Sequence, residues 1–220
     1  MPSLTWRGRD VPVSTQYDDP YYSMDNGWQE AGYVFVDGND LATRLEDGFS
    51  IAELGFGTGL NLLAAWSCWR ASAQQGTFSF TSFEAHPLDA EDMARALHPF
   101  DVDGKEALVR AWADSSGESR ILEMEGLRAT VFIGPVELAL PKWTGQADAW
   151  FLDGFAPSRN PQMWTSQVLH EVARHTRPKG TIATYTAASA VRRGLEDAGF
   201  AVERLPGFGR KRHMLRGALL

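Results

Sequence analysis

Three glycines at alternate positions follow a short run of residues that is typical of a strand. The letters IAELGFGTGL span residues 51–60, and a helical pattern begins just beyond them. Glycine lets the backbone approach a ligand closely, and the N–H groups that open a helix favour negative or polar groups. A dinucleotide site usually has the spacing G-x-G-x-x-G. The spacing G-x-G-x-G, with Glu53 before it, instead suits the ammonium group of S-adenosylmethionine, although a tight turn alone also explains the glycines.

Two further acids end predicted strands. Glu84 closes residues 77–84, about 25 residues beyond the last glycine, where an acid that binds ribose is expected. Asp153 closes residues 147–153 and enters a loop made rigid by Pro157 and Pro161. A carboxylate in such a pocket wall is able to hold or deprotonate an amine, which favours N-methylation. The alternative for Asp153 is a residue that only caps its loop.

The order of predicted elements supports a sheet that brings these acids together. Strands are expected at 50–54, 78–84, 129–133, 148–153 and 180–185, and helices at 59–72, 87–98, 104–115, 135–140, 162–175 and 187–198. Residues 32–39 are expected to be extended, and 39–46 to form a short helix. This alternation predicts an α/β, Rossmann-like fold with a mostly parallel sheet and helices on both faces. Together with a glycine loop that suits S-adenosylmethionine, it favours the class I methyltransferase form of that fold. The loops after the first, second and fourth strands should converge.

Length and composition bound the remaining expectations. A chain of 220 residues with 44% apolar content favours one domain at 1–220, with an amino-terminal extension or lid at 1–48 and a core at 49–220. We find no apolar run of bilayer length and no signal peptide, so we expect a cytoplasmic protein with no membrane partner. The single cysteine, Cys68, and the spacing of the five histidines predict no metal site.

The net charge of −7 hides an asymmetry. Residues 1–158 carry 10 basic and 24 acidic side chains, a balance of −14, whereas residues 159–220 carry 11 and 4, a balance of +7. A basic surface on an acidic body raises the hypothesis of an anionic partner. The alternative is that these cations pack the carboxy-terminal segment through salt bridges.

Several motifs resemble one known family. LDGFAP at residues 152–157 with NPQMWT at 160–165, DDPYYS at 18–23, and GFGRKR at 207–212 are similar to the methyltransferase part of the bacterial tRNA 5-methylaminomethyl-2-thiouridine biosynthesis family, MnmC. The resemblance covers residues 10–218. It implies methyl transfer from S-adenosylmethionine to the primary amine of a 5-aminomethyluridine at the tRNA wobble position.

The resemblance and the patterns above together predict the site. The predicted catalytic residue is Asp153. The donor is expected to contact Glu53, Gly55, Gly57, Thr58, Gly59, Asn61, Glu84, Asp153 and Gly154. The tRNA is expected to contact Tyr22, Phe155, Pro157, Arg192, Arg193, Arg210, Lys211 and Arg212.

Two features depart from the family pattern. The bifunctional members continue into an FAD-dependent oxidase, and this sequence shows no second nucleotide-binding pattern, so we expect no FAD and a separate enzyme that supplies the aminomethyluridine. Pro135 follows Gly134 where an acid that meets adenine is expected, and Glu137 is the candidate substitute. The alternatives are a methyltransferase for a small amine or carboxylate metabolite and a binding module without catalysis. A dehydrogenase is disfavoured by Glu53 and the third glycine.

Overall fold

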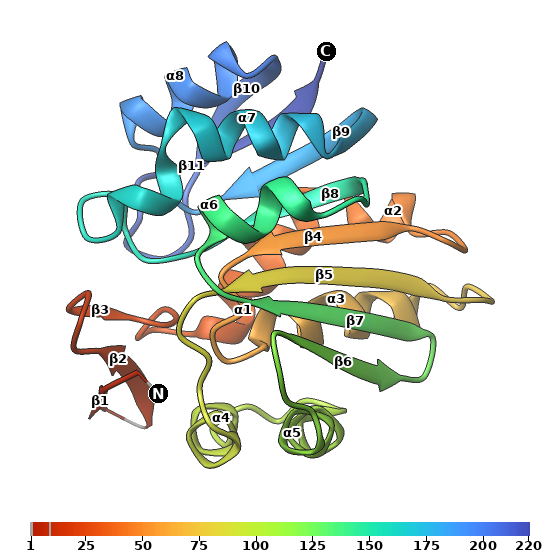
Figure 1. The fold of residues 1–220 in the computed structure, drawn as a ribbon, viewed down its shortest axis with the longest axis vertical. Coiled ribbons are helices and arrows are strands. Elements are labelled where there is room, and N and C mark those ends of the chain that lie inside the picture. Colours follow the sequence, from red (N-terminus) through yellow and green to blue (C-terminus); the bar gives the residue numbers. More distant parts are fainter. Residues whose placement is uncertain (1, 9) are drawn as a thin grey trace.

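The computed structural model describes residues 2–8 and 10–220, with an eight-stranded sheet at its centre (Figure 1). From one edge to the other, the strands are β10 (Phe200–Pro206), β11 (His213–Leu219), β9 (Thr176–Thr184), β8 (Ala147–Leu152), β4 (Ser50–Leu54), β5 (Phe78–Glu84), β7 (Leu127–Ile133) and β6 (Ser119–Met124).

The five inner strands, β9, β8, β4, β5 and β7, are parallel to one another. The edges are antiparallel, because β6 pairs with β7, and β11 pairs with both β9 and β10. Parallel strands end at the same edge of a sheet, so the loops after β4, β5 and β8 meet, as the sequence predicts. The N–H of Gly55 after β4, for example, donates to the carbonyl oxygen of Phe83 in β5 at 2.9 Å.

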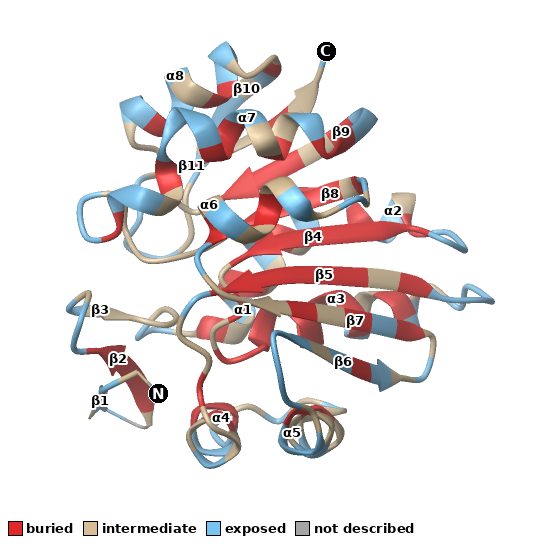
Figure 2. Ribbon diagram, in the orientation of Figure 1, coloured by how far each residue is buried: buried red, intermediate tan, exposed pale blue. Residues whose placement is uncertain are grey.

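Helices cover both faces of the sheet, and alternation along each strand supplies a core to each face. In β8, Phe151 packs with one core and Trp150 with the other, and both are fully buried. The three central strands, β8, β4 and β5, are accordingly buried over most of their length (Figure 2). One core takes in α3 (Leu60–Ala71), α4 (Ala90–Leu97) and α5 (Lys105–Asp114), and the other α6 (Val136–Ala139), α7 (Ser166–Arg174) and α8 (Ser189–Asp197).

One expected extended segment is a helix in the structure, so that prediction is wrong. Residues Gly32–Asp37 form a π-helical turn that continues α1 (Gly27–Ala31) and precedes α2 (Leu41–Arg44). The side chain of Asn26 starts α1 by accepting from the N–H of Gln29 at 3.0 Å. The apolar, β-branched run that is typical of a strand instead buries Val34 and Phe35 against the sheet. Tertiary packing overrides local propensity here.

Several strands were not expected. β10 and β11 form an antiparallel hairpin, and β1 (Leu4–Arg7), β2 (Val11–Ser14) and β3 (Asp19–Pro20) form a small separate sheet. Figure 1 shows this small sheet beside the edge at which the inner strands end. Short 3₁₀ turns at Leu140–Lys142 and Pro161–Trp164 complete the order of elements. Across the residues described, we find no helix of the length and apolarity that a membrane crossing requires.

Candidate active site

The glycine loop after β4 is held in a left-handed backbone conformation. Gly55 has φ +85°, and a Cβ there would lie 3.0 Å from the carbonyl oxygen of Asp153. Gly57 has φ +54°, and a Cβ there would lie 3.2 Å from Cδ1 of Tyr21. Both positions therefore require glycine, for the backbone angle and for the close neighbour.

Glu84 at the end of β5 lies next to this loop. Its Oε2 accepts from the N–H of Gly57 at 2.9 Å, and its Oε1 accepts from the N–H of His86 at 2.7 Å. The residue is about nine-tenths buried and lines the cavity described below. The backbone therefore orients the carboxylate that the sequence assigns to ribose.

Two carboxylates are joined through one amide at the ends of β4 and β8. Nδ2 of Asn61 donates to Oε1 of Glu53 at 3.0 Å and to Oδ2 of Asp153 at 2.7 Å. Oε2 of Glu53 accepts from the hydroxyl of Ser82 at 2.7 Å. Glu53 is fully buried, and burial raises its pKa well above the ordinary value for a glutamate.

Asp153 is the titratable group best placed for chemistry near neutral pH. Burial raises the pKa of its carboxyl to about 6, against the opposing effect of the hydrogen bonds from Asn61 and from the N–H of Gly154. The Gly154 bond to Oδ1 is 2.8 Å long. A carboxylate with this pKa is largely ionised at neutral pH yet accepts a proton readily.

A cavity of about 700 Å³ joins these groups. Its wall combines the loops after β4, β5 and β8 with the amino-terminal segment and the β10–β11 turn. Of the predicted site residues, those in the wall are Gly55, Gly57, Thr58, Asn61, Glu84, Asp153, Gly154, Tyr22, Phe155, Arg210 and Lys211. Those outside it are Glu53, Gly59, Pro157, Arg192, Arg193 and Arg212.

Glu53 is thus placed differently from the expectation that it meets an ammonium group directly. Asn61 lies between it and Asp153 and uses Nδ2 to contact both carboxylates. A direct contact of Glu53 with the donor stays a prediction.

An aromatic wall, formed by Tyr17, Tyr21 and Phe155, was largely missed from the sequence. The rings of Tyr17 and Phe155 stack with centroids 4.6 Å apart, and Tyr21 meets Phe155 edge-on at 5.1 Å. The hydroxyl of Tyr17 lies 3.2 Å from Nε2 of His86. The cluster of tyrosines between residues 17 and 22 is the signal in the sequence that indicates this wall. The sequence analysis predicts a role in the site for Tyr22 alone among them. Tyr22 lines the cavity, but its hydroxyl donates to the carbonyl of Ala96 at 2.8 Å.

Some of the predicted basic residues form ion pairs with acidic side chains, and others do not. Lys211 binds Oε1 of Glu30 at 2.8 Å and lies 3.7 Å from the ring centre of Tyr185. Arg192 pairs with Glu196 at 3.4 Å. Arg210 is 91% exposed and lies 3.6 Å from Asp25. Arg193 and Arg212 are exposed and have no ion pair among the residues that the structure describes.

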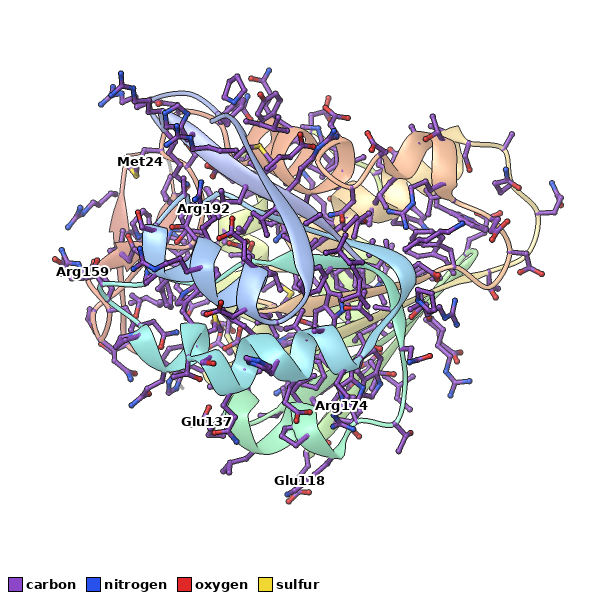
Figure 3. All side chains as sticks on the ribbon, turned by 90° about the horizontal axis from the view of Figure 1, so that it is seen from above. Met24, Glu118, Glu137, Arg159, Arg174 and Arg192 are labelled. Atoms are coloured by element: carbon purple, nitrogen blue, oxygen red, sulfur yellow. The ribbon has the colours of Figure 1, made fainter. Side chains whose placement is uncertain are left out.

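These contacts support both readings of the basic segment in part. Lys211, Arg192 and Arg210 make salt bridges, as the alternative reading expects, although Arg210 is 91% exposed. Arg193 and Arg212 have no ion pair among the described residues and stay available to an anion. In the view of Figure 3, Arg192 lies on the side of the molecule that carries Arg159 and the cavity residue Met24.

Pro135 and Glu137, at and near the position where an acid is expected to meet adenine, lie outside the described lining of the cavity. Glu137 lies on α6 (Figure 3). The lining residues that follow Glu84 are Ala85 and His86. Glu137 as a contact for adenine therefore stays a prediction.

The wall fits a donor that has a ribose and an ammonium group. Glu84 presents an oriented acid, the Gly57 backbone leaves space that a side chain would reduce, and Asp153 and Asn61 lie further along the same wall. Together with the sheet order, this glycine loop and these acids define a Rossmann-like methyltransferase. A profile described as S-adenosyl-L-methionine-dependent methyltransferase matches residues 102–219. The chain belongs to that family, and its cofactor is S-adenosylmethionine.

The curated relatives are more specific in name. The chain is 44% identical to the tRNA 5-methylaminomethyl-2-thiouridine biosynthesis bifunctional protein MnmC of Nitrosospira multiformis, over 98% of this chain and 36% of that protein. It is 40% identical to the protein of the same name from Leptospira interrogans, over 98% of this chain and 35% of that protein. The chain thus spans about a third of the length of the relatives that it matches. In fold it resembles the crystal structure of MnmC2 from Aquifex aeolicus, with a TM-score of 0.76 at 23% identity, over 100% of this chain and 70% of that one.

Proposed function

We propose that the protein transfers a methyl group from S-adenosylmethionine to the nitrogen of a 5-aminomethyl group on the wobble uridine of tRNA. The product would be a 5-methylaminomethyluridine, with or without 2-thiolation. The observation that carries the proposal is the position of Asp153, whose carboxylate lies in the same cavity wall as the glycine loop and Glu84. The relatives named for 5-methylaminomethyl-2-thiouridine biosynthesis supply the acceptor class.

The chemistry requires a neutral amine. A primary ammonium has no lone pair, so a proton must leave before or during formation of the N–C bond. When bound, S-adenosylmethionine supplies an electrophilic methyl group on a sulfonium sulfur. With the donor held by the wall that carries Gly57 and Glu84, the carboxylate of Asp153 would accept the proton that the acceptor nitrogen gives up. The pKa of about 6 leaves Asp153 ionised for this role at neutral pH.

The size of the cavity is compatible with a donor and one nucleobase. Its volume of about 700 Å³ lies in the upper part of the roughly 300–1,000 Å³ range of small-molecule sites. An RNA enters such a site by exposing one unstacked base, which aromatic side chains commonly stack upon. Phe155 and Tyr17 provide aromatic faces in this wall.

Exposed cations in the carboxy-terminal segment, one of them in the cavity wall, favour a polyanionic acceptor. Arg210 lines the cavity and is 91% exposed, and Arg212 and Arg193 are also exposed. Exposed cations of this kind bind phosphates with a strong dependence on salt. The acidic remainder of the chain repels RNA, so these residues should guide the acceptor to one face.

A second candidate is a methyltransferase for a small amine metabolite. The observation that favours it is the internal pairing of Lys211 with Glu30 and of Arg192 with Glu196, which reduces the charge available to a phosphate backbone.

Incubation with methyl-labelled donor separates the two candidates. Under the proposal, tRNA from a strain that lacks the modification gains label, and small primary amines at the same nitrogen concentration gain little. Filter binding of that tRNA should weaken steeply as salt is added. Labelling of small amines, together with no binding of tRNA at low salt, would favour the metabolite enzyme.

A further inference from the structure

The amide of Asn61 has an unusual environment. Its Nδ2 lies 3.0 Å from Oε1 of Glu53 and 2.7 Å from Oδ2 of Asp153, and the residue is about nine-tenths buried. An amide nitrogen carries two hydrogens. Each of them therefore has a carboxyl oxygen as its acceptor, and one side chain connects the buried Glu53 with the partly buried Asp153.

These two contacts fix the orientation of the amide. Rotating it by half a turn would place Oδ1 against Oδ2 of the ionised Asp153 carboxylate, with no hydrogen between the two oxygens. Oδ1 makes no hydrogen bond within the parts of the chain described, 2–8 and 10–220, and Asn61 belongs to the cavity wall. The nitrogen faces the acids in the only arrangement that satisfies them.

The side chain of Glu53 does not line the cavity among the residues described. Its carboxylate is fully buried, and its two oxygens are taken by Asn61 and by the hydroxyl of Ser82 at 2.7 Å. An uncharged side chain at residue 53, either a protonated glutamic acid or a glutamine, would keep the hydrogen bonds with Asn61 and Ser82. Burial favours the protonated form, since it raises the pKa of this carboxyl.

We infer that Asn61 is a positioning residue, which orients the carboxylate of Asp153 and stabilises its charged form, and that Glu53 serves as the anchor of Asn61 rather than as a ligand of the donor. That Asp153 accepts the proton of an amine rests on the proposed function. The state of the Asp153 carboxyl and the binding of the donor are measurable without any acceptor, so a failure of the inference is distinguishable from a wrong acceptor.

The test is a carbon NMR titration of protein labelled at the aspartate carboxyl carbons, with the Asp153 signal assigned by its loss in Asp153→Asn. Asn61→Ala should raise the pKa of Asp153 by on the order of one pH unit, because the carboxylate loses a hydrogen bond to its charged form. Ser82→Ala is the matched control. It removes the other hydrogen bond to Glu53, does not touch Asp153, and should leave that pKa within a few tenths of a unit.

Glu53→Gln tests the anchor. Its amide oxygen can accept from Asn61 while its nitrogen donates to the hydroxyl of Ser82, so the pKa of Asp153 should stay near the wild-type value. Calorimetry should find S-adenosylmethionine affinity within about threefold of wild type, because no charge that faces the donor has been removed. This variant tests the inference even if Asn61→Ala fails to fold, as judged by circular dichroism.

Two results would overturn the inference. An unchanged Asp153 pKa in folded Asn61→Ala would show that the amide does not control the acid. A tenfold or larger loss of donor affinity in folded Glu53→Gln would show that the charge of Glu53 acts on the donor directly.

Discussion

The carboxylate of Glu84 accepts a hydrogen bond of 2.9 Å from the backbone N–H of Gly57, across 27 residues of sequence. The bond joins the acid at the end of β5 to the glycine loop after β4, so the two motifs form one wall of the cavity. The same backbone angle that excludes a side chain at Gly57 presents its N–H to Glu84. Binding of the donor should therefore depend on both residues.

Removal of the Glu84 carboxylate should weaken donor binding. We expect Glu84→Ala to lose roughly 1–3 kcal/mol of binding free energy for S-adenosylmethionine, the scale for stranding buried hydroxyls without their acceptor. Isothermal calorimetry measures this directly, with Glu106→Ala as the control because Glu106 is exposed on α5 and lies outside the described lining. If turnover falls while affinity stays the same, Glu84 has another role.

A side chain at Gly57 should block the donor. Gly57→Val places a branched side chain at φ +54°, where even a Cβ lies 3.2 Å from Tyr21, and we expect donor binding to be abolished in a folded protein. Gly48→Val is a matched control, since Gly48 has φ +79° but no atom within 4 Å of its added Cβ. The control has comparable backbone strain and should bind the donor normally. Retained affinity in Gly57→Val would remove this loop from the donor site.

Asp153 should matter for turnover more than for donor binding. Asparagine has nearly the same shape but accepts no proton, so Asp153→Asn should lower turnover by about 100-fold or more, the scale of general base catalysis. Single-turnover rates and calorimetry on the same preparation separate the two effects. Unchanged turnover would exclude Asp153 from the chemical step.

The rate should depend on pH through the same group. Burial raises the pKa of Asp153 to about 6, so the charged form is lost as the pH falls through 6. If the ionised form accepts the proton, turnover rises about tenfold per pH unit below 6 and levels off above, with a further rise as the acceptor ammonium deprotonates. The rise in turnover near pH 6 should be absent from the pH profile of the Asp153→Asn variant. A flat wild-type profile would mean that proton removal is not part of the slow step.

Charge at the β10–β11 turn should control RNA binding. Reversing Arg210 and Arg212 to glutamate should weaken tRNA binding and reduce the slope of log affinity against log salt by about one to two, with donor affinity intact. The reversals Arg110→Glu and Arg128→Glu make the same change of charge at exposed residues outside the described lining and form the control. The same tRNA affinity and salt slope in a folded Arg210 and Arg212 variant would place the RNA elsewhere.

The parts of the fold that follow from local pattern were predictable. The strands at 50–54 and 78–84 have the predicted bounds, because alternation and flanking turn residues mark both ends. The π-helical turn at Gly32–Asp37 was not predictable, since its apolar, β-branched run is equally typical of a strand. The hairpin of β10 and β11 depends on pairing with β9, which local pattern does not reveal.

The site divides in the same way. Residues at or just after strand ends, such as Glu84 and Asp153, were predictable because parallel topology brings strand ends together. The pair of Lys211 with Glu30 joins residues 181 positions apart, and the amide of Asn61 between two acids depends on side-chain packing. No pattern in the sequence encodes either contact. The division into a lid and a core, the cytoplasmic location, the absence of FAD and a separate enzyme for the acceptor stay predictions.

Nucleoside analysis of methylated tRNA tests the central claim most directly. Purified protein, methyl-labelled S-adenosylmethionine and tRNA that carries 5-aminomethyluridine are incubated, and the tRNA is digested to nucleosides for mass spectrometry. We predict loss of the 5-aminomethyl nucleoside and appearance of its 5-methylaminomethyl product with one label on the side-chain nitrogen. Label on a ribose, on a ring atom or on another nucleoside, or no label in tRNA under conditions in which the donor binds, would contradict the proposed function.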